Sequence, residues 1–440
     1  MKVLNRNDLN EKFFNKDYEL EKDILVKGFV CSCREMSWGS FFVIRNCNET
    51  IQCVVTHDIA HNIVPESYVE VKGLFTPASL KNKLLTIQDR EIRVSEFRVI
   101  NSPVSALPID LSKNELSLNL DTSLDLRELS LRHSFNRAVF KIQSIVSSSF
   151  TEYLEAQGFT KVHTPKISPQ AVESGSSVFS LDYFGKKACL AQSPQLYKQM
   201  MVPVFDRVFE VGPVFRAEKH STSRHLNEYI SLDVEMTLEN DFYDLIYLEV
   251  RVLEFIFNNL KKKCSKELII LDVELPKIES VVIMSFEEVH DIVWSVYGKD
   301  YRSELDLAPE EEKLICEYVK EKYSTDFVFV SHYPIETRPF YTKADKIRPD
   351  TSLSFDLLFR GVEITTGGQR LDKYEDYIER LEKSGISSES LENYLNTFKF
   401  STSQHGGFGL GLERLVSKIC GLKNIKEASL FPRDCNRITP

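Results

Sequence analysis

Short runs of hydrophobic and other strand-forming residues alternate with turns between residues 23 and 100. This pattern predicts five strands, at Ile24–Cys33, Ser40–Arg45, Thr50–Thr56, Tyr68–Phe75 and Leu84–Val94. Five strands in about 80 residues are typical of a small closed barrel such as an OB-fold.

A barrel of this type commonly binds single-stranded nucleic acid through aromatic and basic side chains on one face. Arg34, Phe41 and Gln52 would supply a charge, a stacking surface and a hydrogen-bonding group for such binding. The alternative is that Phe41 belongs to the hydrophobic core, as phenylalanine commonly does. The residues of the barrel taken alone favour this alternative.

Clear periodicity is lost after the barrel, where residues 101–126 include two prolines. This stretch is the predicted linker between two domains. We therefore expect an N-terminal extension over residues 1–22, a barrel domain over 23–104, a hinge over 105–130 and a second domain over 131–440.

Two further strands, with charged faces, are predicted between residues 204 and 236. In the first, Arg216 and Glu218 are two positions apart, so a strand places both on one face. In the second, apolar and polar residues alternate: Leu232, Val234, Met236 and Leu238 with Ser231, Asp233, Glu235 and Thr237. The connecting loop is basic and is expected to be mobile. It would bind a polyphosphate through Lys219, His220, Arg224 and His225. An exposed hairpin with solvated charges is the alternative, and the hairpin alone favours neither.

Two other polar segments are candidates for ligand binding. Residues 173–177, beginning with Glu173 and Ser174, form a short polar loop that would close over a ligand, with an ordinary surface loop as the alternative. Gln195 and Lys198 lie at a predicted turn into a helix, where a lysine among polar side chains could receive an anion.

A candidate metal site lies farther along the chain. Glu363 and Thr366 supply a carboxylate and a hydroxyl three residues apart, which suit a hard cation such as Mg²⁺. The following pair of glycines, 367–368, permits close approach of the backbone to a ligand. Residues 241–335, including an acidic helix near Pro309–Lys322 that is predicted to be exposed, carry no recognisable chemistry.

The common nucleotide-binding motifs are absent from the sequence. The glycine-rich segment 405–419 contains Gly411 and Arg414, but it lacks the third glycine of GxGxxG. No GxxxxGK[ST] segment occurs anywhere. A nucleotide would therefore need a different binding site.

Composition narrows the class of protein. The chain has 440 residues, of which 42% are hydrophobic and 27% charged, and no apolar run approaches a membrane span. The first 22 residues are polar and rich in acids and do not match a signal or transit peptide, so we expect a cytoplasmic protein. A net charge of -10 confines any nucleic-acid binding to local basic faces. Nine cysteines without a CxxC pair favour reduced thiols over disulfide or zinc frameworks.

The segments FRAE, RHLNEY, GVEITTGGQR and GLGLERL occur in this order and together resemble the class II aminoacyl-tRNA synthetases. A strand ending at Pro165 matches the first family motif, Phe215 to Glu235 the second and Gly409 to Arg414 the third. QSPQLYKQ, GGQR and the closing LFPRD narrow the resemblance to the archaeal and eukaryotic aspartyl-tRNA synthetases. The resemblance implies an α+β homodimer with an N-terminal OB-fold that binds the anticodon. It also implies a C-terminal catalytic domain built from an antiparallel sheet flanked by helices.

The resemblance also implies roles for the residues that match the family motifs. Arg216 and Arg414 would be catalytic, and ATP would contact Arg216, Glu218, Arg224, His225, Tyr229, Glu363, Gly411 and Arg414. L-Aspartate would contact Glu173, Ser174, Gln195, Lys198, Arg216, Asp233, Thr366 and Arg370. Glu363 and Thr366 would bind Mg²⁺, although the family more often has serine at the second position. Arg34, Phe41 and Gln52 would contact the anticodon, which weakens the assignment of Phe41 to the core.

The implied activity is aspartate–tRNA ligation with ATP, L-aspartate and tRNA(Asp) as partners and no membrane. Asparaginyl-tRNA synthetase is the nearest alternative, and Lys198 and Arg370 argue against it. A carboxylate about 4 Å from each cation gains on the order of 4 kcal/mol per pair at an effective dielectric near 20, whereas an amide gains little. A non-discriminating enzyme that also charges tRNA(Asn), and a non-catalytic RNA-binding relative, are further alternatives. Asp372 stands where many family members have histidine, so the contacts there are open.

Overall fold

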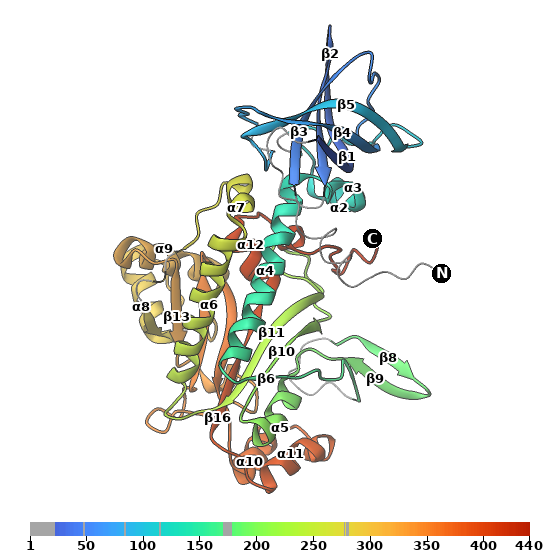
Figure 1. The fold of residues 1–440 in the computed structure, drawn as a ribbon. Coiled ribbons are helices and arrows are strands. Elements are labelled where there is room, and N and C mark those ends of the chain that lie inside the picture. The colour runs from blue at the N-terminus through green and yellow to red at the C-terminus, as the bar shows by residue number, and fades with distance from the viewer. Residues whose placement is uncertain are drawn as a thin grey trace. The chain divides into compact units, whose positions relative to one another are not determined.

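The computed structural model describes residues 23–440 except 47–48, 83–84, 114–115, 170–177, 277 and 279–280. The chain divides between residues 135 and 136 into two compact units (Figure 1). Among the helices of the described residues, none is long and apolar enough to cross a membrane.

The N-terminal unit contains a closed barrel of five strands in the order β1-β2-β3-β5-β4, as the alternating pattern predicted. The strands are β1 (Asp23–Met36), β2 (Gly39–Asn46), β3 (Glu49–Thr56), β4 (Tyr68–Pro77) and β5 (Arg90–Asn101). The short helices α2 (Leu120–Asp125) and α3 (Arg127–Ser130) follow. Alternate residues such as Phe42 and Ile44 fill the interior.

The fifth strand begins later than predicted. Leu84 lies outside the described residues, and residues 86 and 87 donate their backbone N–H groups to the Thr50 carbonyl at 3.2 Å. The Thr86 hydroxyl accepts from the Thr50 N–H at 2.8 Å. These bonds hold residues 86 and 87 beside Thr50, at the start of β3. The fifth strand, β5, therefore begins only at Arg90.

The C-terminal unit is built on an eight-stranded sheet in the order β12-β13-β14-β15-β16-β11-β10-β6. The strands are β6 (Thr160–Lys161), β10 (Arg207–Phe215), β11 (Glu228–Thr237), β12 (Ile283–Ser285), β13 (Phe327–Ser331), β14 (Ser354–Phe359), β15 (Val362–Gln369) and β16 (His405–Gly411). Its inner pairs are antiparallel, and the two edge pairs are parallel. The family resemblance implied this domain of an antiparallel sheet flanked by helices, and the structure confirms it.

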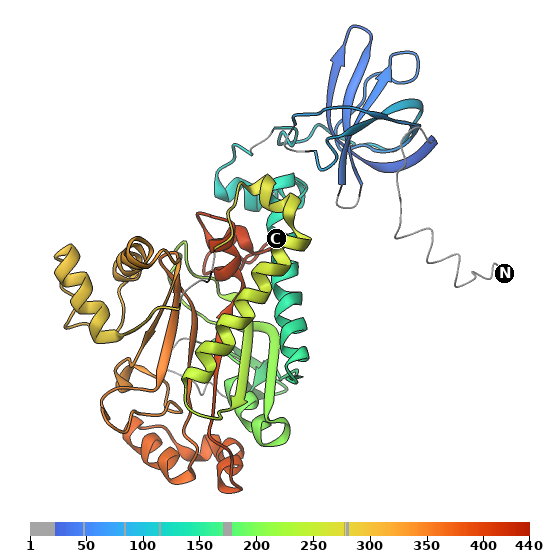
Figure 2. The same cartoon turned by 60° about the vertical axis from the view of Figure 1, so that its left-hand side comes forward.

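Helices cover one face of this sheet. α4 (Ser134–Ala156), α6 (Tyr243–Lys263) and α12 (Leu412–Ile419) lie along it (Figures 1 and 2). The remaining elements are β7 (Ile167–Ser168), β8 (Ser180–Tyr183), β9 (Lys186–Leu190), α5 (Gln195–Phe205), α7 (Ser265–Leu271), α8 (Phe286–Tyr297), α9 (Pro309–Tyr323), α10 (Tyr374–Ser384) and α11 (Glu392–Lys399), with 3-10 turns η1 (Ile335–Thr337), η2 (Ser388–Leu391) and η3 (Ile425–Ala428). β7, β9 and β8 form a separate small sheet.

The two charged strands predicted between residues 204 and 236 are β10 and β11, which pair antiparallel from Arg207–Met236 to Phe215–Glu228. β11 lies in the middle of the sheet, between β10 and β16. Lys198 and Arg370 pair with its acids, and Asp233 and Glu235 are 3% and 0% exposed. The alternative of solvated charges is wrong for this strand.

The prediction that the acidic helix near Pro309–Lys322 is exposed is wrong for its first turn. In α9, Glu311 and Glu312 are buried. Glu311 pairs with the buried His290 of α8 at 2.7 Å, and Glu312 pairs with Arg224. The Arg224 side chain and the Glu363 N–H explain why the carboxylate of Glu312 is tolerated there.

Glu249 of α6 lies beneath the sheet and makes stability depend on pH. It accepts a 2.5 Å hydrogen bond from the Thr365 hydroxyl, and burial raises the pKa of Glu249 from 4.5 to about 8. The folded chain therefore holds a proton that the unfolded chain releases near pH 4.5, so this contribution to stability is complete below pH 4.5 and is lost as pH rises towards 8. We expect the melting temperature of the Glu249→Gln variant to fall less between pH 6 and pH 8.5 than that of the wild type. Parallel thermal-unfolding profiles of the two proteins would contradict this assignment.

Candidate active site

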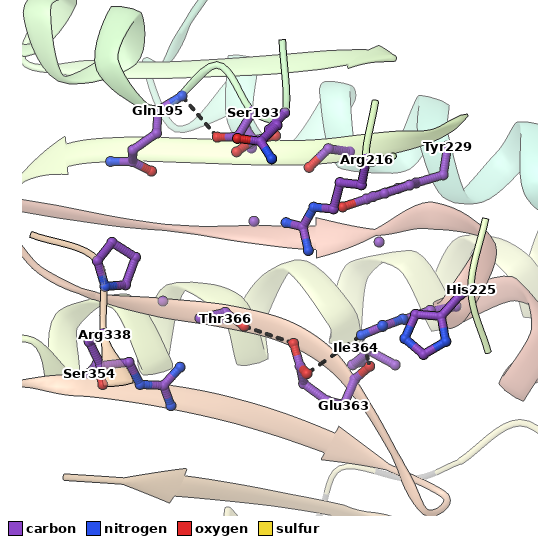
Figure 3. A pocket seen from close by; sticks show the side chains of 18 of the residues that line it. Ser193, Gln195, Arg216, His225, Tyr229, Arg338, Ser354, Glu363, Ile364 and Thr366 are labelled. Carbon is purple, nitrogen blue, oxygen red and sulfur yellow. Dashed lines mark hydrogen bonds and ion pairs between the residues drawn. The ribbon is translucent and has the colours of Figure 1, made fainter. Parts of the chain in front are cut away.

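A cavity of about 540 Å³ opens on the face of the sheet opposite α6. Its walls come from α5, the β10–β11 hairpin, β15, the residues after η1 and the start of α12 (Figure 3). The described site residues predicted for ATP and aspartate all line it: Gln195, Lys198, Arg216, Glu218, Arg224, His225, Tyr229, Asp233, Glu363, Thr366, Arg370, Gly411 and Arg414. Glu173 and Ser174 lie outside the described residues.

A bulge in β15 brings the predicted metal ligands together. In a regular strand, residues three apart point to opposite faces. Here Thr365 is opposite Leu357 and Glu363 is opposite Leu358, so Ile364 is an extra residue. The Thr366 hydroxyl consequently donates to the Glu363 carboxylate at 2.8 Å (Figure 3).

The Glu363 carboxylate is suited to bind a cation. Burial tends to raise the pKa of Glu363, but Arg414 and the Thr366 hydrogen bond outweigh it and hold the pKa below its ordinary value. Arg414 lies 3.6 Å from the carboxylate and also donates to the Glu363 carbonyl at 2.9 Å. Two protein oxygens fit Mg²⁺ when phosphates and waters complete the coordination. Within the described chain, no cluster of three or more His, Cys, Asp or Glu side chains offers a complete metal site.

Arg216 is placed by its own backbone and an asparagine. Its N–H donates to the Asn227 carbonyl at 2.9 Å, and the Asn227 amide donates to the Arg216 and Glu218 carbonyls at 2.6 and 3.0 Å. The guanidinium lies 5.7 Å from the centre of the Tyr229 ring. These hydrogen bonds hold the two ends of the hairpin loop together. Arg216 and Glu218 therefore face the cavity although β10 ends at Phe215.

The basic loop contributes only part of what was predicted. Arg224 and His225 line the cavity, whereas Lys219 and His220 are exposed and do not. Arg224 is anchored by its ion pair with Glu312, whose carboxylate also accepts from the Glu363 N–H at 3.1 Å. One buried carboxylate therefore joins the loop to the strand that carries the predicted metal ligands.

His225 is a neutral donor or acceptor in this arrangement. Burial, together with Arg414 and Arg224, lowers the pKa of His225 despite the opposing effect of Glu218, which lies 3.7 Å away. The Thr222 hydroxyl lies 2.6 Å from Nδ1. A phosphate would thus meet the charges of Arg224 and Arg414 and the neutral imidazole of His225.

Lys198 is buried at the other end of the cavity, with 1% exposure. Its ammonium donates to the Asp233 carboxylate at 2.9 Å and to the carbonyls of Val234 and Phe408 at 3.2 and 3.3 Å. Glu235 lies 3.5 Å away. Each of the three N–H groups of the lysine therefore has an acceptor within the protein.

Arg370 follows β15 and meets the same acids. Its Nε donates to Glu235 at 2.9 Å, and its Nη2 donates to the Gln195 amide oxygen at 3.2 Å and the Gly407 carbonyl at 3.0 Å. The contacts of Arg370 with described residues use these two nitrogens, so Nη1 is the edge that a substrate carboxylate would meet. The charges of Lys198 and Arg370 are balanced by those of Asp233, which was predicted for this site, and of Glu235, which was not.

Glycines in two strands permit this packing. A Cβ at Gly407 would overlap the Val234 carbonyl and the Glu235 carboxylate. A Cβ at Gly367 would approach the Phe355 and Phe408 side chains to 2.5 and 2.8 Å. Gly367 also lines the cavity, so its missing side chain permits close packing of the strands while its backbone stays beside the candidate site.

Several cavity residues were missed by the sequence analysis. Arg338 lines the cavity and pairs with Asp356 at 2.8 and 3.2 Å in a bidentate contact. Asp356 was detectable as an acid inside the buried strand β14, because such a charge requires a partner. Nothing in the sequence indicated Arg338, or Glu312 as a partner of Arg224.

The predicted anticodon residues share the outer face of the barrel. Arg34 is directly opposite Phe41, and Val43, two residues from Phe41 on β2, is opposite Gln52. Phe41 is half-buried and lies 5.3 Å from the exposed Trp38 ring, which the sequence analysis did not single out. The neighbouring Phe42 occupies the core instead.

Known proteins share both the sequence and the fold of this chain. A family model described as class II tRNA synthetases (D, K and N) matches residues 119–435. An aspartate–tRNA(Asp/Asn) ligase of Thermus thermophilus is 40% identical, covering 95% of this chain and 97% of the relative. A ligase of the same description from Deinococcus radiodurans is 39% identical over 95% of both chains. The structure of an asparaginyl-tRNA synthetase from Pyrococcus horikoshii, complexed with asparaginyl-adenylate, is 29% identical, covers 96% of this chain and 97% of its own, and gives a TM-score of 0.87.

Proposed function

The chain belongs to the class II tRNA synthetases, and from this membership we propose that it is an aspartate–tRNA ligase. The observation that carries the proposal is a single cavity with a pair of cations at each end. Arg370 would bind the side-chain carboxylate of L-aspartate through Nη1, and Lys198, whose N–H groups already have acceptors, would contribute its positive charge. Arg216 and Arg414 would bind the phosphates of ATP.

The reaction has two steps. The aspartate α-carboxylate attacks the α-phosphorus of ATP, the bond to the β-phosphate oxygen breaks, and pyrophosphate leaves with that electron pair. A terminal ribose hydroxyl of tRNA(Asp) then attacks the carbonyl carbon of the adenylate, and AMP leaves. The attacking carboxylate is already ionised, so the first step needs no general base and depends on in-line positioning and charge stabilisation.

The described residues have distinct tasks in this scheme. Arg216 would contact the α-phosphate, where charge develops, and Tyr229 and Glu218 would hold the adenine. His225 (Figure 3) would hold the outer phosphates together with Arg224 and Arg414. Glu363 and Thr366 would hold Mg²⁺, which when bound supplies positive charge to the phosphate oxygens.

In the barrel, Arg34, Phe41 and Gln52 would contact the anticodon. The assembly implied by the family resemblance is a homodimer.

Selection of aspartate over asparagine would rest on hydrogen-bond direction more than on net charge. Lys198, Arg370, Asp233 and Glu235 sum to zero charge, so the long-range attraction is smaller than that of two free cations. The Nη1 edge of Arg370 is donor-only, and an asparagine amide placed there would turn either its NH₂ group or a weaker acceptor towards it. A carboxylate presents a charged acceptor to this edge whichever of its oxygens faces Nη1.

Pyrophosphate exchange by the full chain tests the proposal. We expect exchange that depends on L-aspartate, with L-asparagine at least about 100-fold less effective, because a site built for one polar group rejects its analogue strongly. Exchange that depends on asparagine and not on aspartate would contradict it.

A second candidate function is charging of both tRNA(Asp) and tRNA(Asn), which is favoured by the descriptions of the Thermus and Deinococcus relatives. Parallel aminoacylation of the two tRNAs with labelled aspartate distinguishes the candidates. Aspartate on tRNA(Asp) alone supports the specific enzyme, and aspartate on both supports the second candidate.

A further inference from the structure

A chain of buried polar side chains extends behind the amino-acid end of the cavity. α10 and α11 pack through a hydrophobic cluster against Leu196 and Met200 of α5, the helix that carries Gln195 and Lys198. Within this contact, the Gln199 amide lies 3.1 Å from each of Tyr377 Oη, Tyr394 Oη and His405 Nε2. Gln199 also accepts from the Gln195 amide at 3.1 Å.

The protons of His405 and Tyr377 have one consistent arrangement. His405 Nδ1 lies 2.9 Å from the Ser403 carbonyl, which can only accept, so Nδ1 carries the proton. Burial lowers the pKa of His405, so its imidazole is neutral and Nε2 is an acceptor. Tyr377 likewise donates to the Leu371 carbonyl at 2.9 Å, so its oxygen accepts the remaining contacts.

These two acceptors determine the orientation of both glutamines. The Gln199 NH₂ group must face His405 Nε2 and Tyr377 Oη, so its oxygen faces Tyr394 and Gln195. The Gln195 NH₂ group therefore donates to Gln199, and its second proton is directed to Glu235 at 3.1 Å.

The chain ends at the predicted aspartate site. With its NH₂ group committed, Gln195 presents its amide oxygen to Arg370 Nη2 at 3.2 Å. Reversing the amide would place an NH₂ group against the guanidinium and an oxygen against the Glu235 carboxylate. The arrangement therefore restrains Arg370 through Nε and Nη2 and leaves its Nη1 edge to the cavity.

We propose that Tyr377, Tyr394, His405 and Gln199 are positioning residues through which α10 and α11 orient Gln195 and Arg370 for the substrate carboxylate. This inference rests on the proposed function. None of the four residues lines the cavity, so each acts through Gln195 and not by contact with aspartate. Removing the polar group of any of the four residues leaves its buried partners without a hydrogen bond and allows the Gln195 amide to turn. Arg370 is then less well oriented and binds a carboxylate more weakly.

Tyr377→Phe in the full chain is the principal test. Removing this hydroxyl deprives the Gln199 NH₂ group of an acceptor, and we expect KM for aspartate in pyrophosphate exchange to rise about five- to tenfold, the loss typical of one buried hydrogen bond. KM for ATP should change by less than about twofold, because the ATP end of the cavity is untouched. Tyr394→Phe should show the same split with a smaller rise.

Tyr374→Phe is the matched control. Tyr374 is a half-buried tyrosine at the start of α10 that packs against the same cluster, and its ring lies 5.1 Å from Lys399 Nζ, away from the glutamines. It should leave both KM values unchanged.

An unchanged KM for aspartate in both Tyr377→Phe and Tyr394→Phe would overturn the inference. Equal rises in KM for aspartate and ATP would also overturn it, since they would indicate general loosening of the fold. If Tyr377→Phe does not fold, Tyr394→Phe alone decides by the same criterion. Absence of aspartate-dependent exchange in the wild type would overturn the proposed function itself, whereas normal wild-type exchange with unaffected variants overturns only this inference.

Discussion

Lys198→Ala is expected to lower aspartate-dependent pyrophosphate exchange by at least about 10³-fold, since it removes a buried cation and leaves charged partners unpaired. The lysine is 1% exposed and bonds Asp233 at 2.9 Å. Without it, Asp233 and Glu235 outnumber the remaining cation, Arg370, and the site repels the substrate carboxylate. Exchange assays over a range of aspartate concentrations measure the loss.

The same substitution has a cost in stability. Breaking a buried ion pair by removing one partner costs about 3–5 kcal/mol. The variant should therefore be compared with wild type by thermal unfolding, and its activity measured well below its melting temperature.

Lys166→Ala is a matched control. Lys166 also pairs with a buried carboxylate, Glu210, at 2.8 Å, but it does not line the cavity. This variant should retain exchange, while near-normal exchange by Lys198→Ala would contradict the assignment of the aspartate end.

Arg216→Ala is expected to reduce kcat for exchange by about 10²–10³-fold, with a smaller change in KM for ATP. Removal of one preorganised donor to a developing charge typically has an effect of this size. Lysine should rescue the activity poorly, because it cannot reproduce the planar fork of a guanidinium. Steady-state exchange and single-turnover adenylate formation measure the two parameters.

The fold of Arg216→Ala should be intact. Asn227 holds the hairpin through the backbone of residue 216, and both contacts survive substitution of the side chain. A melting temperature close to that of the wild type with exchange reduced less than tenfold would contradict the catalytic role of Arg216.

Some features of this protein follow from the sequence alone. Strand-forming runs between turns predicted the barrel strands, and period-two alternation predicted β10 and β11, since alternation records which side chains of a strand face the interior. The order of short motifs indicated the family. These are local properties, so they can be detected without knowing which distant segments meet.

Tertiary structure decided the parts of the site that depend on distant segments. Glu363 and Thr366 share a face only because β15 bulges at Ile364 against β14, and strict alternation would separate them. Arg224 is anchored by Glu312 of α9, 88 residues away, in a helix that composition alone suggested was exposed. Lys198 and Arg370 meet the carboxylates of Asp233 and Glu235 because α5 packs against β11 and β15 lies one strand away from β11 in the sheet. Periodicity records the face of each residue, whereas the charge of a pocket depends on which faces the fold brings together.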